Sequence, residues 1–314
     1  MQLSGRSAAQ GAPKIDPMHT LSRQQLILLV LLTLVWGFNW PIMKFGVTGF
    51  PPLTFRTACM WIGLPVLGLF LVWRGVSFRI GRQHWRELAV LTVFNMLFWH
   101  TLAILAVQSL SSGRAAILGY TMPVFSAVIG ALWFGQRLSP RASFGVAAAA
   151  LGVVLLLWHE ISTLSGKPLG VAMMLVAAGT WAVGTQLMRR TRIDAPTLAI
   201  SFWMTLLTTV WMTLMSVLFE RDAWVAPNPW QWMAIVYNAL GVFAFAQVVW
   251  LTMARDLPPI ASTLSVMFIP VLGVLSGAWW LSEVLHWQDG AAVALVMLAI
   301  ATVLWPSPAS VTRA

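Results

Sequence analysis

Polar side chains inside long apolar runs are the first candidates for chemistry in this sequence. His100 is the only histidine far from the end of such a run, and Asn39 and Gln247 lie deep inside two others. Hydrocarbon makes an unpaired polar group costly, so an ionisable side chain within a membrane segment is by default a functional candidate. We expect His100, Asn39 and Gln247 to hold polar groups of a bound small molecule. The alternative for each is a structural hydrogen bond to a neighbouring helix.

Aromatic side chains supply the second set of candidates. Tyr120 stands three residues before Pro123, which removes a helical hydrogen bond at a point that protein or cavity water must cover. Tyr and Trp present flat apolar faces with one polar edge, which suits the side chain of an amino acid. We expect Tyr120 and Trp181 to enclose that part of a ligand. Further candidates, with anchoring at the membrane interface as the alternative, are Trp36, Trp40, Trp99, Trp203 and Trp250.

Arg56 is the one basic residue that falls within an apolar run, near its start. Two interpretations fit this position. The long side chain could extend to the membrane surface and leave its charge in water. It could instead attract the carboxylate of a ligand, which a guanidinium binds well.

Several catalytic constellations are absent from the sequence. It contains no GxxxxGK[ST], no Gly-x-Ser-x-Gly, and no HExxH around His159 and Glu160. The nine acidic residues all fall outside the middle of the apolar runs, which argues against a proton relay built on a buried carboxylate. We therefore expect no enzyme activity, no metal and no cofactor. If protons are coupled to the function at all, His100 is the group with a suitable unperturbed pKa, about 6.5.

The elements that must position these residues are membrane-spanning helices. The chain has 314 residues, of which 59% are hydrophobic and 9% charged. A soluble domain carries about 25% charged residues, so a water-exposed surface cannot be assembled. A spanning helix needs about 20 mostly apolar residues. By that measure the sequence predicts ten spans, at 26–44, 52–73, 87–107, 114–134, 142–158, 168–188, 196–219, 231–254, 260–281 and 287–305.

A weak internal repeat relates the two halves of the chain. The segment 112–138 recurs 147 positions later as 259–285, with Pro123 opposite Pro270 and His100 opposite Gln247. Trp36 is echoed by Trp181 at an offset of 145. Five spans per half is an odd number, so the second half enters the membrane upside down. We predict an all-α membrane protein with ten transmembrane helices, arranged as two inverted five-helix repeats at 26–158 and 168–305. A disordered tail at 1–25 and a second tail at 306–314 complete the domain plan.

Basic residues set the orientation of these spans. Of the 19 Lys and Arg residues, 14 fall in segments on the side of the N-terminus and 4 on the other side. Loops rich in Lys and Arg stay in the cytoplasm, so both termini are predicted to be cytoplasmic. The net charge of +10 does not predict nucleic-acid binding, because the basic residues lie in short gaps between apolar runs.

The sequence resembles the EamA group of the drug/metabolite transporter superfamily over about residues 25–305. The resemblance rests on Trp36-Gly37-Phe38-Asn39-Trp40-Pro41 and on the later Pro270-Val271, Gly277, Trp280 and Glu283. The family's usual glutamate in the first repeat is replaced by Gln136. Trp99, His100, Tyr120 and Trp181 are similar to the pocket of YddG-like exporters of aromatic amino acids. The resemblance implies a bacterial inner membrane and export of metabolites.

The expected function is secondary transport, with aromatic and other neutral amino acids or related metabolites moving outward by alternating access as uniport or facilitated diffusion. The expected partners are the small-molecule substrate and the lipid bilayer, and the sequence does not predict an oligomeric state. One alternative is a multidrug or lipid-carrier exporter on the same scaffold. Another is a non-transport subunit of a membrane assembly.

Overall fold

The computed structural model describes residues 22–162, 167–253 and 259–304, and within them every regular element is a helix. Most of the two predicted tails, at 1–21 and 306–314, lies outside the described residues. The first helix begins at Arg23, three residues before the predicted span, because Ser22 and Gln25 form a reciprocal capping box. The two bonds satisfy backbone donors that would otherwise be left open at the helix start.

Seven of the spans are single helices: α1 (Arg23–Val47), α2 (Pro52–Trp73), α7 (Pro140–Ser162), α8 (Pro168–Met188), α9 (Thr197–Phe219), α12 (Pro259–Leu281) and α13 (Trp287–Leu304). The third span is composed of η1 (Arg82–His84), α3 (Trp85–Thr92), η2 (Val93–Leu97) and α4 (Phe98–Ser109). The fourth is split into α5 (Ser112–Gly119) and α6 (Met122–Phe134). The eighth joins α10 (Pro229–Val236), η4 (Tyr237–Ala246) and α11 (Gln247–Met253), and η3 (Arg221–Ala223) precedes it.

These spans confirm the prediction of an all-α membrane protein with ten helices. In the described residues, seven spans are long and apolar enough to cross a membrane, and three further apolar stretches, Pro140–Leu156, Ser265–Leu281 and Trp287–Val303, are shorter. Large apolar side chains also face outward, among them Trp73 at 77% and Trp279 at 80% exposed. An apolar exterior of this kind matches lipid rather than water.

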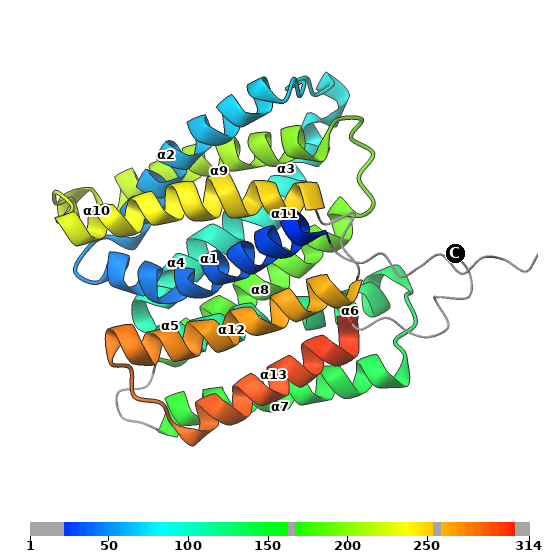
Figure 1. Ribbon diagram of the computed structural model, residues 1–314, viewed down its shortest axis with the longest axis vertical. Helices are drawn as coiled ribbons and strands as arrows, with labels where there is room; N and C mark the ends of the chain where they lie inside the picture. The colour runs from blue at the N-terminus through cyan, green and yellow to red at the C-terminus, as the bar shows by residue number, and fades with distance from the viewer. Residues whose placement is uncertain (1–21, 163–166, 254–258, 305–314) are drawn as a thin grey trace, which may run out of the picture.

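The helices lie side by side in a stack, with α2 and α9 at one edge and α7 and α13 at the other (Figure 1). The contacts within the bundle are paired between the halves. α1 packs against α12, and its counterpart α8 packs against α6. In the same way, α2 packs against η4, and its counterpart α9 packs against η2. This is the pattern expected when a two-fold axis exchanges the halves. The division at 26–158 and 168–305 stays a prediction, and the paired contacts support it.

The two halves run in opposite directions through the bundle. Lys44, at the end of α1, donates hydrogen bonds to Val107 O at 3.1 Å and Gln108 O at 2.8 Å. Gly170, at the start of α8, lies against Ser109 and Leu110. The end of α1 and the start of α8 therefore meet at the same end of the bundle. This is the antiparallel arrangement that an odd number of spans per half requires.

The repeated segment keeps its local geometry in both copies. Gln136 N donates to Gly130 O at 3.0 Å, and Glu283 N donates to Gly277 O at 3.4 Å. Gly135 and Ser282, at matching repeat positions, both have left-handed backbone, with φ of 63° and 54°. Such a residue ends a helix by folding the chain back onto its last turn. The first copy breaks after Gly119, as the position of Pro123 predicts, whereas α12 continues through Pro270.

Candidate functional site

A central cavity of about 710 Å³ lies between helices of both halves. It starts in the middle of the bundle, near Tyr120 and Trp36, and reaches the end where α8 stops at Met188 and α9 starts at Thr197. Gln136 and Arg189 line it there and are exposed, so the cavity opens at that end. The volume falls within the range of about 300–1,000 Å³ that is typical of small-molecule sites.

Four of the predicted site residues line this cavity: Trp36, Tyr120, Trp181 and Gln247. The two tryptophans occupy matching positions of the repeat, so each half contributes one aromatic wall. Trp250 also lines it and packs on Trp36 with ring centroids 5.7 Å apart. Gln247 donates to the hydroxyl of Ser201 at 3.4 Å. Together these side chains offer apolar faces with amide and hydroxyl groups between them.

Two further predicted residues lie behind the cavity wall. Trp40 meets Tyr120 edge to face with centroids 6.3 Å apart, and Trp99 meets Trp181 in the same way at 5.2 Å. Neither Trp40 nor Trp99 lines the cavity. They pack instead against Tyr120 and Trp181, which line it, and form an aromatic layer where the cavity ends. Edge-to-face pairs of this kind fix ring orientation.

The remaining predicted residues, Asn39, Arg56 and His100, are buried outside the cavity. Asn39 is 9% exposed, and its Oδ1 has no hydrogen-bond partner among the described residues. Arg56 is 4% exposed, so it does not extend to the membrane surface and that interpretation is wrong. His100 and Arg56 both contact the ring of Phe243, at 5.3 Å and 5.6 Å from its centroid.

Trp203, named as a further aromatic candidate, also lies away from the cavity. Its indole donates to Phe78 O at 2.7 Å, and its ring packs edge to face on Trp85 at 5.1 Å.

Two polar residues of the cavity wall, Gln186 and Asn95, are not among the predicted site residues. Gln186 is 1% exposed and donates to Ser126 O at 2.8 Å and Ser126 Oγ at 3.0 Å, while its Oε1 accepts from Arg190 at 2.8 Å. Asn95 lines the cavity, and its Nδ2 has no partner among the described residues. That nitrogen is buried and lies close to Gly184 on α8. Asn95 and Gln186 lie inside apolar runs, as Asn39 does, so the same signal could have singled them out.

Both halves contain a π-helix at the matching place. The segments η2 and η4 lie in the third span of each half, and an offset of 147 carries Val93–Leu97 into Tyr237–Ala246. π-helical turns widen a helix and are frequent at functional sites. Here η2 carries Asn95 and Met96 into the cavity wall, whereas η4 carries Phe243, which is buried outside the cavity. Nothing in the local sequence predicts these turns.

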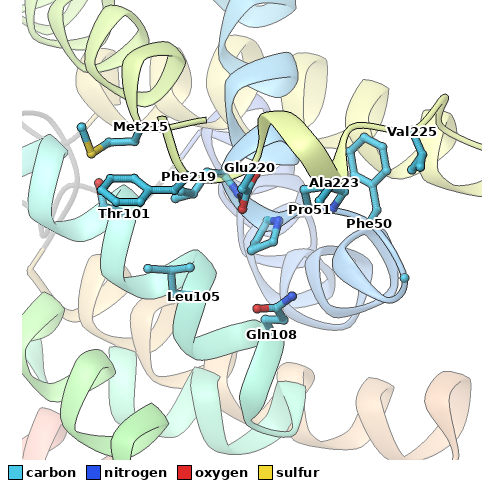
Figure 2. A pocket seen from close by; sticks show the side chains of 13 residues that line it. Phe50, Pro51, Thr101, Leu105, Gln108, Met215, Phe219, Glu220, Ala223 and Val225 are labelled. Carbon is cyan, nitrogen blue, oxygen red and sulfur yellow. Dashed lines mark hydrogen bonds between the residues drawn. The ribbon is translucent and has the colours of Figure 1, made fainter. Parts of the chain in front are cut away.

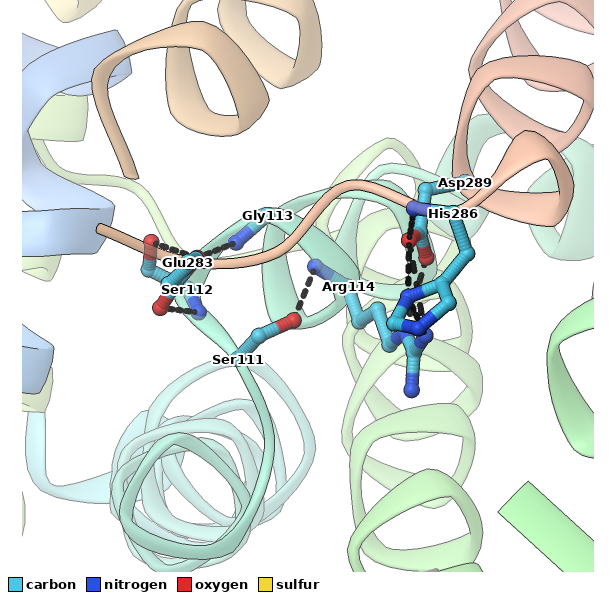
Figure 3. Close-up of polar contacts among 7 residues, drawn as sticks. All are labelled: Ser111, Ser112, Gly113, Arg114, Glu283, His286 and Asp289. Carbon is cyan, nitrogen blue, oxygen red and sulfur yellow. Dashed lines mark hydrogen bonds and ion pairs between the residues drawn. The ribbon is translucent and has the colours of Figure 1, made fainter. Parts of the chain in front are cut away.

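The opposite end of the bundle is closed by bonds between the halves (Figure 3). The carboxylate of Glu283 accepts from Ser112 N at 2.7 Å, from Ser112 Oγ at 2.9 Å and from Gly113 N at 3.3 Å. A negative charge at the first turn of α5 also complements the positive end of that helix. Arg114 and Asp289 form an ion pair at 2.7 Å close by. Gln136, the counterpart of Glu283, contacts Gln186 at 3.5 Å instead.

A second pocket of about 660 Å³ lies near this closed end (Figure 2). It is bounded by Thr101 and Leu105 on α4 and by Met215 and Phe219 on α9. Glu220 closes one side and accepts from the first turn of α2, at Leu53 N (2.9 Å) and Thr54 N (2.7 Å). α9 runs from the central cavity at Thr197 to this pocket at Phe219, so the two hollows lie at opposite ends.

Known proteins share this sequence pattern and fold. The chain is 25% identical over 276 residues to a Bacillus subtilis protein named "Uncharacterized transporter YoaV", covering 87% of this chain and 92% of that one. It is 23% identical over 299 residues to an Escherichia coli protein named "Probable amino-acid metabolite efflux pump", covering 89% and 94%. A solved crystal structure, 22% identical, shares the fold with a TM-score of 0.64 over 89% of this chain and 96% of that chain.

The family follows from a sequence profile that covers most of the chain. The profile of the EamA-like transporter family matches residues 24–158 and 168–305. Together with ten apolar spans, this match makes the chain a multi-pass membrane transporter. The chain belongs to the EamA-like transporter family.

Proposed function

We propose that this chain is a carrier, not an enzyme, that exports neutral amino acids or related small zwitterionic metabolites across a bacterial inner membrane. Both termini lie in the cytoplasm, so the central cavity faces the cytoplasm. Transport is facilitated diffusion by alternating access. The relative named as an amino-acid metabolite efflux pump supports the choice of substrate class.

The observation that carries this proposal is the lining of the central cavity. Trp36, Tyr120 and Trp181 supply three aromatic faces from both halves. Asn95 and Gln247 place amide groups beside them, and among the described lining residues Arg189 is the only charged one. A lining that is aromatic and amide-rich, without an acid, suits a neutral or zwitterionic ligand. A cationic drug would meet no countercharge there.

The mechanism follows from the two ends of the bundle. The substrate enters from the open end and its side chain packs on the aromatic faces, while the amide side chains of Asn95 and Gln247 lie beside its polar groups. For release, the bonds at the closed end between Glu283 and α5 and between Glu220 and α2 must separate. The halves would exchange roles because they are related by inversion. This alternation around a fixed site is the common pattern for inverted-repeat carriers.

Reconstituted liposomes test the proposal. Purified protein should exchange labelled phenylalanine, methionine or threonine down a concentration gradient, without a pH gradient, while protein-free liposomes should not. A lipophilic organic cation serves as the drug comparison. Exchange of the cation but of no amino acid would favour the multidrug alternative. Exchange of neither would remove the proposal.

A further inference from the structure

Arg56 is a buried cation without a countercharge in the part of the chain that the structure describes. Its Nη1 donates to Asn238 Oδ1 at 3.4 Å and its Nη2 donates to Met43 Sδ at 2.8 Å. Among the described residues, its Nε has no partner, and no carboxylate forms an ion pair with it. An uncompensated charge within a membrane bundle is expensive, and proteins retain it where a ligand or a pathway uses it.

The surroundings of Arg56 are polar but incompletely satisfied. Asn238 is fully buried, and its Nδ2 is held by Ala234 O at 3.1 Å, which turns its Oδ1 toward Arg56. His100 packs on the same Phe243 ring, and its Nδ1 has no partner among the described residues. Buried polar atoms are normally paired, so unpaired ones at one place indicate a missing partner.

The internal repeat shows where such a partner would bind. An offset of 145, the one that relates Trp36 to Trp181, relates Arg56 to Ser201 and Cys59 to Met204. An offset of 147 relates His100 to Gln247. Ser201, Met204 and Gln247 all line the open cavity. Their counterparts Arg56, Cys59 and His100 are buried at 4%, 0% and 8% exposure. If the halves exchange roles, the buried set becomes the cavity wall.

We propose that in the state open at the opposite end, Arg56 forms the wall of a second binding position and holds the carboxylate of the substrate there. This inference rests on the proposed carrier function and adds that the two states bind the substrate with different chemical groups. The present cavity meets the substrate with neutral amide and hydroxyl groups, Gln247 and Ser201. The alternate cavity would meet it with a guanidinium and an imidazole. The ligand class is a small organic carboxylate.

Ligand binding to purified protein in detergent tests this without any need for transport. The probes are 3-phenylpropionate and its uncharged amide, 3-phenylpropionamide, which differ only in the ionised group. Thermal stabilisation, followed by tryptophan fluorescence, gives the affinity for each. The wild type should bind the acid about tenfold more tightly than the amide, because hydrogen bonds to an ionised partner are the stronger kind. Arg56→Gln should abolish that difference, and Arg56→Lys should retain part of it.

Arg74→Gln is the matched control, because Arg74 lies at the end of the same helix as Arg56, is exposed and lines neither pocket. It should keep the preference for the acid. Arg189→Gln tests the competing site, because Arg189 is the one charged residue among the described residues that line the present cavity. Equal binding of acid and amide by the wild type, or loss of the preference in Arg189→Gln but not in Arg56→Gln, would overturn the proposal. Arg56→Lys keeps the test decisive if Arg56→Gln does not fold, since a structural role alone would leave the acid preference of the lysine variant unchanged.

A chloride titration distinguishes a site for organic carboxylates from a site for inorganic monovalent anions. The titrations are run in a zwitterionic buffer with and without added chloride. Stabilisation by chloride as strong as by the acid, and lost in Arg56→Gln, would make this an inorganic anion site and contradict the carboxylate assignment. Failure of amino-acid exchange in liposomes with a preserved acid preference would contradict the proposed function and leave the Arg56 site standing.

Discussion

At the scale of single residues, the cavity combines predictable and unpredictable parts. Trp36 and Trp181 could be paired from sequence because the repeat matches them, and both reach the cavity. Asn95 could not be preferred over other buried amides, because its role depends on the π-helical turn that directs it inward. His100 shows the reverse case. Its chemistry is evident from sequence, yet it lies outside the cavity in this state.

Replacing an aromatic wall should weaken substrate binding without unfolding the protein. Trp181→Ala is expected to raise the apparent KM for phenylalanine exchange about tenfold, equivalent to roughly 1.4 kcal/mol of lost contact. Trp279→Ala removes the same side chain from the surface, where it is 80% exposed, and should leave KM unchanged. Similar shifts in both variants would mean that Trp181 does not contact the substrate.

At the scale of elements, hydropathy predicts the spans and misses their interruptions. Apolar length alone locates ten helices, because every backbone group in lipid must be satisfied within its own segment. The break between Gly119 and Met122 follows from Pro123, but Pro270 at the matching position leaves α12 continuous. The π-helices η2 and η4 pack against neighbouring helices, and a single-sequence pattern does not contain that packing.

The contact between α8 and η2 gives a prediction with a control on the same helix. A Cβ on Gly184 would lie 2.6 Å from Asn95 Cγ and 2.7 Å from Asn95 N, closer than real contacts allow. Gly184→Ala should therefore lose about 1–3 kcal/mol of stability and reduce transport, since η2 must shift. A Cβ on Gly179 meets nothing within 4 Å. Gly179→Ala should be neutral or stabilising by up to about 1 kcal/mol.

Thermal melting of the two glycine variants in the same detergent decides this point. The order expected is Gly179→Ala at or above wild type and Gly184→Ala below it. A Gly184→Ala protein with wild-type melting and transport would show that η2 and α8 are not closely packed in the working protein.

At the scale of the whole molecule, the structure is asymmetric although its halves are related. One end holds an open cavity of about 710 Å³, and the other is tied by carboxylates to the starts of α5 and α2. The repeat predicts the relation between the halves, because matching residues are visible in the sequence. It cannot predict which end is open, because both states obey the same symmetry. Cys59 and Ala127 can report on the two states of the carrier. Ala127 lines the open cavity, whereas Cys59 is fully buried and matches Met204 of the cavity wall in the repeat.

Accessibility of two cysteines from the two sides of the membrane tests alternating access most directly. Cys59 is the single native cysteine, and Ala127→Cys in a Cys59→Ala background reports on the cavity. A membrane-impermeant thiol reagent should label Ala127→Cys from the cytoplasmic side only and Cys59 from the opposite side only. Conditions that raise labelling at one position should lower it at the other. Labelling of both positions from the same side, or no labelling of Cys59 in protein that transports, would contradict the account.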